Sequence, residues 1–245
     1  MKLFKLILLC LFLFSNAYAN TIYELIKIPH LEIYNIKTQN KLRYLYAKQP
    51  FTIGVDNNIN CFNSTKKDLE KKYLIIEKNL SRYPKNFLKK INLKYIVLCE
   101  NLSVSQINTA GVPNIRTKTL VIDIKFNEEH FERVLHHEIF HMINDSHKKE
   151  FFYEKWKNFN TSEFKYSKCS TCSDRLGLSL LKENKGFLTE YSMSTVSEDM
   201  AEVFSFLMMS KKKIEDKALI DPILNKKIVF IKKNINKIDK NFKFY

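Results

Sequence analysis

The stretch NEEHFERVLHHEIFHMIND, residues 127–145, decides the fold and carries the most informative motif of the chain. At about 100° per residue its apolar side chains fall on one side, whereas His137 and His141 fall roughly opposite. Glu128 and Glu129 stand in the first turn, where the helix dipole favours acids. The pattern predicts one helix over these residues, with its back in the core and two histidines on its front.

Histidines four residues apart project from the same face of a helix. The ring nitrogens of His137 and His141 can therefore converge on one tetrahedral ion at about 2.0 to 2.1 Å. Glu138 follows the first histidine directly, where its carboxylate can reach a metal-bound water. A catalytic zinc also needs a third protein ligand and an open position, at which the pKa of bound water falls to about 7. The motif predicts a single catalytic Zn²⁺ with Glu138 as the general base.

The third ligand is expected in the segment EDMAE, residues 198–202. On a helix from about Thr195 to Met209, the apolar side chains share one side and the two acids Glu198 and Glu202 lie together on the other. Two acids facing away from a core are usually only solvated, but an incomplete zinc site elsewhere needs a carboxylate. We predict that Glu198 binds the metal. Glu202, one turn on, would hydrogen-bond the distal nitrogen of a liganding histidine.

Together, HEIFH at residues 137–141 and YSMSTVSEDMAEVF at residues 191–204 resemble the gluzincin metallopeptidases of the anthrax lethal factor catalytic-domain type. Those enzymes carry a Glu-x-x-Ala-Glu segment whose first Glu binds zinc, with a Tyr seven residues before it. The resemblance implies that Tyr191 points its hydroxyl at the substrate carbonyl oxygen and stabilises the oxyanion. It covers roughly residues 60–210 and is strong only in the two motifs. Phe140 departs from it, because a small Gly often stands at that position.

By analogy with zincins, an edge strand beside the motif helix would pair with extended substrate. Residues 117–124 and the turn at residues 110–112 are the candidates. The other histidines are interpreted as structural. His136 projects about 100° away from His137, so we expect it to pack against the body. His130 is a possible rim residue, and His147 lies past the end of the helix.

The rest of the chain predicts short strands separated by helices. Strands are expected at residues 31–36, 43–46, 93–98 and 117–124, with Gly111 and Pro113 marking a turn. Helices are expected from caps at residues 63–65 to before Pro84, at residues 149–159 and, as an amphipathic tail, at about 222–238. The predicted fold is therefore α+β: a zincin-like metallopeptidase domain with a small mixed sheet on the motif helix and a mainly helical C-terminal half.

Residues 1–19 are typical of a secretory signal peptide. Lys2 and Lys5 precede an apolar run at residues 6–14, and Ala-Tyr-Ala at residues 17–19 predicts cleavage after Ala19. An uncleaved N-terminal anchor is the alternative. The remaining roughly 226 residues (245 minus 19) suit one substantial core. We expect an N-terminal segment at residues 20–60 packed on the core, a metallopeptidase domain at residues 61–245, no integral membrane span after cleavage, and a secreted or periplasmic protein.

The four cysteines beyond residue 19 suggest disulfides in an oxidising compartment, for which three pairings are possible. The simplest joins Cys61 to Cys99 and Cys169 to Cys172. A redox role for the Cys-x-x-Cys pair and a second, structural zinc are the weaker alternatives. The formal charge of +15 falls to +13 without Lys2 and Lys5, but the basic residues are dispersed, so we expect no nucleic-acid partner.

The sequence thus predicts an exported, monomeric zinc endopeptidase that acts on peptide or protein substrates. One alternative is a secreted binding protein that keeps a zincin scaffold without turnover. Another is a zinc hydrolase of cell-wall peptides. Two histidines and one carboxylate can also hold other divalent ions, so zinc follows from the ligand types alone.

Overall fold

The computed structural model describes residues 31–34, 41–183 and 185–245. The predicted signal peptide with its cleavage site at Ala19, and residues 35–36 of the first expected strand, lie outside the described residues. In the described part of the chain the fold is mixed α/β, with a mixed sheet and six α-helices. No helix in that part is both long enough and apolar enough to cross a membrane.

Eight strands form the sheet within the described residues. The order β1, β2, β5, β8, β7 contains two parallel pairs at its centre, β2 with β5 and β5 with β8, flanked by antiparallel pairs. The second half of β5 continues into an antiparallel extension with β4, β3 and β6. The strand bounds are β1 (Leu31–Tyr34), β2 (Arg43–Ala47), β3 (Phe51–Ile53), β4 (Ile59–Phe62), β5 (Tyr95–Val104), β6 (Ile107–Asn108), β7 (Gly111–Asn114) and β8 (Thr119–Asp123).

Capping side chains fix where the longer helices begin. Thr65 accepts the N–H of Asp68 at the start of α3, and Asp221 accepts two backbone N–H groups before Pro222, the first residue of α8. The described helices are α3 (Lys66–Leu80), α4 (Phe87–Lys90), α5 (Phe131–Ser146), α6 (Tyr153–Lys157), α7 (Val196–Ala218) and α8 (Pro222–Ile238), with short 3₁₀ turns η1 (Val55–Asn57), η2 (Ser170–Cys172) and η3 (Tyr191–Met193).

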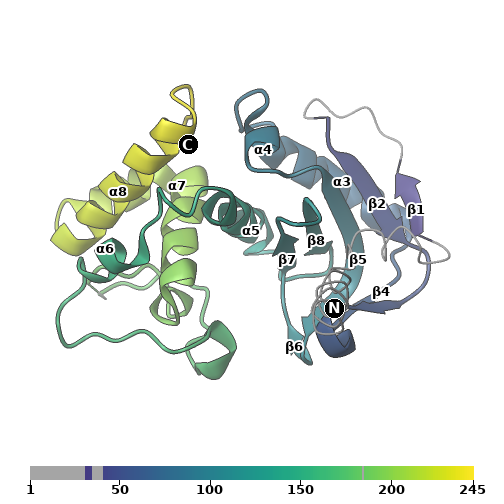
Figure 1. Cartoon of the computed structure of the whole chain (residues 1–245), viewed down its shortest axis with the longest axis horizontal. Helices are drawn as coiled ribbons and strands as arrows, with labels where there is room; N and C mark the ends of the chain where they lie inside the picture. Colours follow the sequence, from purple (N-terminus) through teal and green to yellow (C-terminus); the bar gives the residue numbers. More distant parts are fainter. Residues whose placement is uncertain (1–30, 35–40, 184) are drawn as a thin grey trace, which may run out of the picture.

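The motif helix α5 stands at the centre of the molecule, between the sheet and the helices α6 to α8 (Figure 1). It begins at Phe131, four residues later than the sequence predicts. The preceding residues form a turn in which Asn127 Oδ1 accepts the N–H of Glu129 at 2.9 Å. The acids of that turn therefore precede the helix rather than form its first turn.

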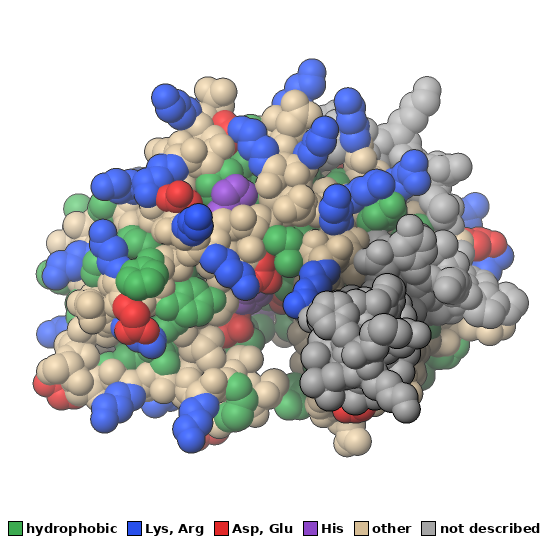
Figure 2. Space-filling view, in the orientation of Figure 1, with side chains coloured by type: hydrophobic (Ala, Val, Ile, Leu, Met, Phe, Trp, Pro, Cys, Tyr) green, Lys and Arg blue, Asp and Glu red, His purple; other side chains and the backbone are tan. Residues whose placement is uncertain are grey.

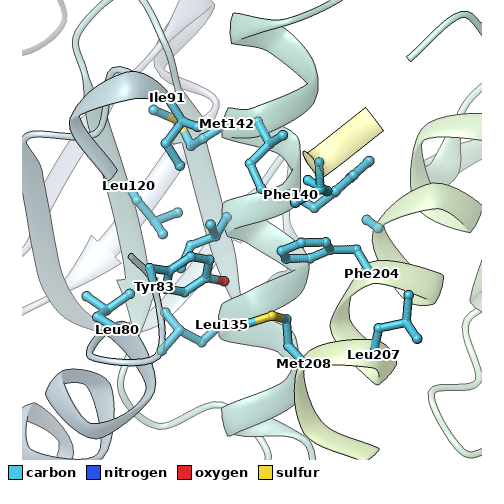
Figure 3. Close-up of a cluster of buried hydrophobic side chains, with 14 of the residues drawn as sticks. Leu80, Tyr83, Ile91, Leu120, Leu135, Phe140, Met142, Phe204, Leu207 and Met208 are labelled. Carbon is cyan, nitrogen blue, oxygen red and sulfur yellow. The ribbon is translucent and has the colours of Figure 1, made fainter. Parts of the chain in front are cut away.

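Apolar side chains on the back of α5 fill the core between the sheet and α7 (Figure 3). Phe140 is fully buried, with its ring centroid 5.1 Å from that of Phe151 and 5.3 Å from that of Phe204. The bulky residue at this motif position therefore points into the helix–helix interface, away from the histidines. Both predicted disulfides are present, Cys61–Cys99 and Cys169–Cys172.

Two local predictions are wrong. Gly111 and Pro113 do not mark a turn, because they lie in β7, an edge strand antiparallel to β8. Proline is tolerated at a sheet edge, where its missing N–H costs no ladder hydrogen bond. The helix predicted at residues 149–159 is only the five-residue α6. By contrast, α7 runs nine residues beyond the predicted end at Met209, with an irregular residue at Ser210.

Candidate metal centre

The packing of α5 against α7 brings together three side chains that lie up to 61 residues apart in sequence. His137 and His141 come from α5, and Glu198 comes from the first turn of α7. One possible ligand atom from each lies within 4.8 Å of the others, and the cluster is largely shielded from solvent. Thr195 caps the start of α7 by accepting the backbone N–H of Glu198. The carboxylate of Glu198 faces the two histidines of α5.

The three ligand atoms form a nearly equilateral triangle. Glu198 Oε2 lies 2.8 Å from His137 Nε2 and 3.2 Å from His141 Nε2, and the two nitrogens are 3.1 Å apart. A tetrahedral ion with bonds of about 2.0 to 2.1 Å has ligands about 3.3 Å apart. The residues present therefore fit a zinc ion after shifts of a few tenths of an ångström.

The distal nitrogens of both histidines also have partners. His137 Nδ1 lies 2.8 Å from Glu202 Oε1, and a carboxylate can only accept, so this nitrogen carries the hydrogen. His141 Nδ1 lies 3.1 Å from the Ser197 hydroxyl, which can accept in the same way. With a hydrogen held on Nδ1, loss of the Nε2 proton leaves in each ring a lone pair directed at the cluster, as a metal ligand requires.

Glu202 is the centre of a buried network that holds His137 in place. Both of its carboxylate oxygens accept from Arg133, at 2.6 and 2.7 Å, and Oε2 also accepts from the Thr189 hydroxyl at 2.8 Å. Arg133, Thr189 and Ser197 were not among the residues predicted for the site. Arg133 was detectable, because it lies one turn before His137 on the same face of α5.

The charges of the cluster perturb one another strongly. Burial lowers the pKa of His137, but its hydrogen bonds to Glu198 and Glu202 outweigh that effect and raise it to about 10. Burial favours the neutral form of Glu198, yet the nearby imidazoles of His141 and His137 hold its pKa well below the usual range. Glu198 is therefore an anion that already attracts positive charge to this point.

Glu138 lies beside the cluster and behaves differently. Burial raises its pKa to about 7, against the opposing effect of the two histidines. Its side chain is held against the edge strand: a Cβ added to Gly111 of β7 would lie 2.7 Å from Glu138 Cγ. Only glycine therefore leaves room for this carboxylate between β7 and α5.

Tyr191, in the 3₁₀ turn η3, lies beside His137. The two ring centroids are 5.7 Å apart. Burial, together with the nearby carboxylates of Glu198 and Glu138, raises the pKa of Tyr191, so its hydroxyl keeps its proton and remains a donor. The structure thus places all six residues that the sequence predicts for the site in one region.

The other three histidines among the described residues lie outside this cluster. His136 is fully buried, with Nδ1 2.7 Å from the Tyr83 hydroxyl and Nε2 3.1 Å from Asn79 Oδ1, so it packs into the body as predicted. His130 and His147 flank α5 as its N-terminal and C-terminal cap residues.

The residue after Glu198 projects about 100° away from it and contacts α6 and α8. Asp199 Oδ2 accepts from Trp156 Nε1 at 2.8 Å, from Lys227 Nζ at 2.7 Å and from the Tyr166 hydroxyl. Lys227, on α8, has no exposed side-chain surface. Through the adjacent residues Glu198 and Asp199, α7 thus contacts both the two histidines of α5 and the tail helix α8.

A His-Glu-x-x-His helix whose histidines converge with a glutamate from a second helix is the arrangement of a metal-dependent hydrolase. The chain belongs to the family described as "Putative zinc-binding metallo-peptidase", whose model matches residues 65–243. That range includes every member of the cluster.

Among solved structures, one described as "a putative zinc-binding metallo-peptidase" from Bacteroides caccae is similar, with 16% sequence identity and a TM-score of 0.42. The match covers 70% of this chain and 67% of that chain. A comparison with curated proteins gives no match.

Proposed function

We propose that the chain is an exported zinc-dependent endopeptidase in which His137, His141 and Glu198 hold one zinc ion. The observation that carries the proposal is the triangle of ligand atoms with edges of 2.8 to 3.2 Å, beside which Glu138 lies. Family membership supports zinc as the ion. The paired distal nitrogens support the same conclusion, since metal-binding histidines usually donate through the other nitrogen.

In this proposal each residue has a separate task. Zinc, when bound, acidifies and orients a water molecule. Glu138 takes the proton of that water and passes it to the leaving amine, a role that suits a carboxylate with a pKa near 7. The Tyr191 hydroxyl donates to the substrate oxygen as negative charge develops there. Glu202, held by Arg133, fixes the ring of His137.

The proposal includes a gluzincin site of the lethal factor-like type on a zincin-like arrangement, with β7 as the strand that pairs with extended substrate. Within the described residues β7 pairs only with β8, so its other edge remains open. Its first residue, Gly111, touches Glu138. A peptide added along this edge would therefore pass directly over the proposed base.

Replacing Gly111 by Ala is expected to lower kcat about 10²-fold while zinc content stays unchanged. The added methyl would lie 2.7 Å from Cγ and 3.1 Å from Cδ of Glu138, so the carboxylate must move. Steady-state kinetics and metal analysis measure the two effects. The matched control is Val112→Ala, whose side chain leaves the strand on the opposite face and should change kcat by less than about twofold. Equal kinetics for the two variants would contradict the proposed contact.

Several features outside the site support the remaining parts of the proposal. Two disulfides are typical of proteins in oxidising compartments and support export after cleavage at Ala19. Lys and Arg side chains are dispersed over the face in Figure 2 rather than gathered in a stripe, which supports a partner other than nucleic acid. We also propose that the protein is a monomer, in which an N-terminal segment at residues 20–60 packs on a metallopeptidase domain at residues 61–245.

The direct test is metal content combined with chelator-sensitive cleavage of an unfolded protein. We expect one zinc per chain, loss of cleavage on removal of the metal, and recovery when zinc returns. Stoichiometric zinc without cleavage of any protein, peptide or cell-wall peptide would favour the secreted binding protein. Cleavage of cell-wall peptides alone would favour the cell-wall hydrolase.

A further inference from the structure

A groove of about 460 Å³ opens beside the metal cluster, in the helical half of the chain. Its walls are α6, the segment at residues 160–168 and the first residues of α7. The rings of Tyr153 and Phe164 and the side chain of Val196 give it apolar surface. It is therefore large enough for one or two amino-acid side chains rather than for a water molecule alone.

The groove and the metal cluster share a residue. Ser197 lines the groove, and its hydroxyl lies 3.1 Å from Nδ1 of His141. The opposite wall, at residues 160–168, is hydrogen-bonded to the segment just before α7, because the N–H of Ser167 donates to the Ser194 carbonyl at 2.8 Å. A substrate positioned for attack at the metal cluster can therefore place a neighbouring side chain in this groove.

All charged residues that line the groove are lysines: Lys157, Lys165 and Lys168. Lys157 is paired with Glu154 at 2.8 Å. Lys165 and Lys168 have no ion-pair partner among residues 31–34, 41–183 and 185–245. Lysines are common on this basic chain, but here they line a concavity from which acids are absent. The start of α7 adds the partial positive charge of a helix N-terminus to the same wall.

We propose that this groove is a substrate subsite that binds a carboxylate near the scissile bond. The proposal rests on the proposed peptidase function and adds the chemical class of substrate. Lys165 and Lys168 supply the positive charge, and the apolar wall packs against the methylenes that carry the carboxylate. The carboxylate is either a Glu or Asp side chain or the C-terminus of the peptide.

The experiment compares matched peptides that differ in one charge. One series replaces Glu by Gln at each position flanking the scissile bond, and a second amidates the C-terminus. Cleavage is measured as kcat/KM with zinc-loaded enzyme. Binding is measured separately by fluorescence anisotropy with the Glu138→Gln variant, which reports on the groove without turnover. We expect the carboxylate peptide to be preferred about tenfold at one position, and the preference to shrink as salt is added.

Charge reversal at the groove tests the assignment. The double variant Lys165→Glu/Lys168→Glu should lose the preference, because its kcat/KM should fall at least about tenfold more for the Glu peptide than for the neutral Gln peptide. The control Lys85→Glu/Lys89→Glu makes the same change in net charge at exposed lysines near α4 and should keep the preference. An equal preference in both double variants, or no preference in the unmodified enzyme, would overturn the proposal.

The two measurements separate this proposal from the proposed function. Charge-dependent binding that Lys165→Glu/Lys168→Glu abolishes, without any cleavage by the unmodified enzyme, would support the groove and contradict the peptidase. Cleavage at a rate that does not depend on substrate charge would support the peptidase and contradict the carboxylate subsite. The amidated series identifies the source of the carboxylate, because only C-terminal recognition is lost on amidation.

Discussion

The Glu138→Gln variant is expected to keep its zinc and to lose about 10³-fold in kcat. Glutamine has almost the same shape as glutamate, so the packing against Gly111 is preserved. Its amide cannot accept a proton, however, whereas burial raises the pKa of Glu138 to about 7, close to the value at which a general base works best in neutral solution. Metal analysis and single-turnover cleavage of one peptide measure zinc and chemistry separately.

Two further variants sharpen this expectation. Glu129→Gln makes the same chemical change at an exposed residue just before α5 and should leave kcat unchanged. Tyr191→Phe removes only a donor to the developing oxyanion, so it should cost about 10²-fold. If Glu138→Gln retained a tenth of the wild-type rate, Glu138 would not be the base and the proposed mechanism would fail.

The second large effect is expected on the affinity of the site for zinc. Glu198→Ala removes the carboxylate that both histidines approach, at 2.8 and 3.2 Å, and should abolish stoichiometric zinc binding. Glu202→Gln keeps an acceptor near His137 but removes the charge, so it should weaken zinc only about 10- to 100-fold. Competition with a chromogenic chelator gives both dissociation constants.

Folding must be monitored alongside affinity, because both acids are buried. Glutamine is used at position 202 because its amide oxygen can still accept from the buried guanidinium of Arg133, whereas Ala would leave that group with neither charge nor acceptor, at a cost of about 3–5 kcal/mol. Circular dichroism of each metal-free variant should show wild-type secondary structure. Weaker zinc binding in Glu202→Gln than in Glu198→Ala would mean that the ligand had been assigned to the wrong acid.

Local chemistry explains which parts of the fold were predictable. The spacing of His137 and His141 determines their shared face on any helix, so their convergence needs no tertiary information. The tail helix begins and ends where predicted, at Pro222 and Ile238, since Asp221 and Pro222 are strong start signals. Likewise Glu198 and Glu202 lie opposite the apolar side of α7, as periodicity requires.

Errors arise where long-range pairing outweighs a local signal. The sequence around Gly111 and Pro113 predicts a turn, but pairing with β8 makes these residues an edge strand. Glycine is required at position 111 because a larger side chain would collide with Glu138, 27 residues later. The contacts of Ser197 with His141 and of Lys227 with Asp199 depend on how helices pack. No periodicity in one sequence specifies such partners.

The contact between α7 and α8 gives the C-terminal helix an unexpected part in the integrity of the enzyme. Glu198 faces the metal cluster, and its neighbour Asp199 faces Lys227, which belongs to α8. Without α8, Asp199 would lose its ion pair with the buried Lys227, a loss of about 3–5 kcal/mol next to a proposed metal ligand. We therefore expect a chain that lacks α8 to bind zinc poorly, although it keeps all three proposed ligands.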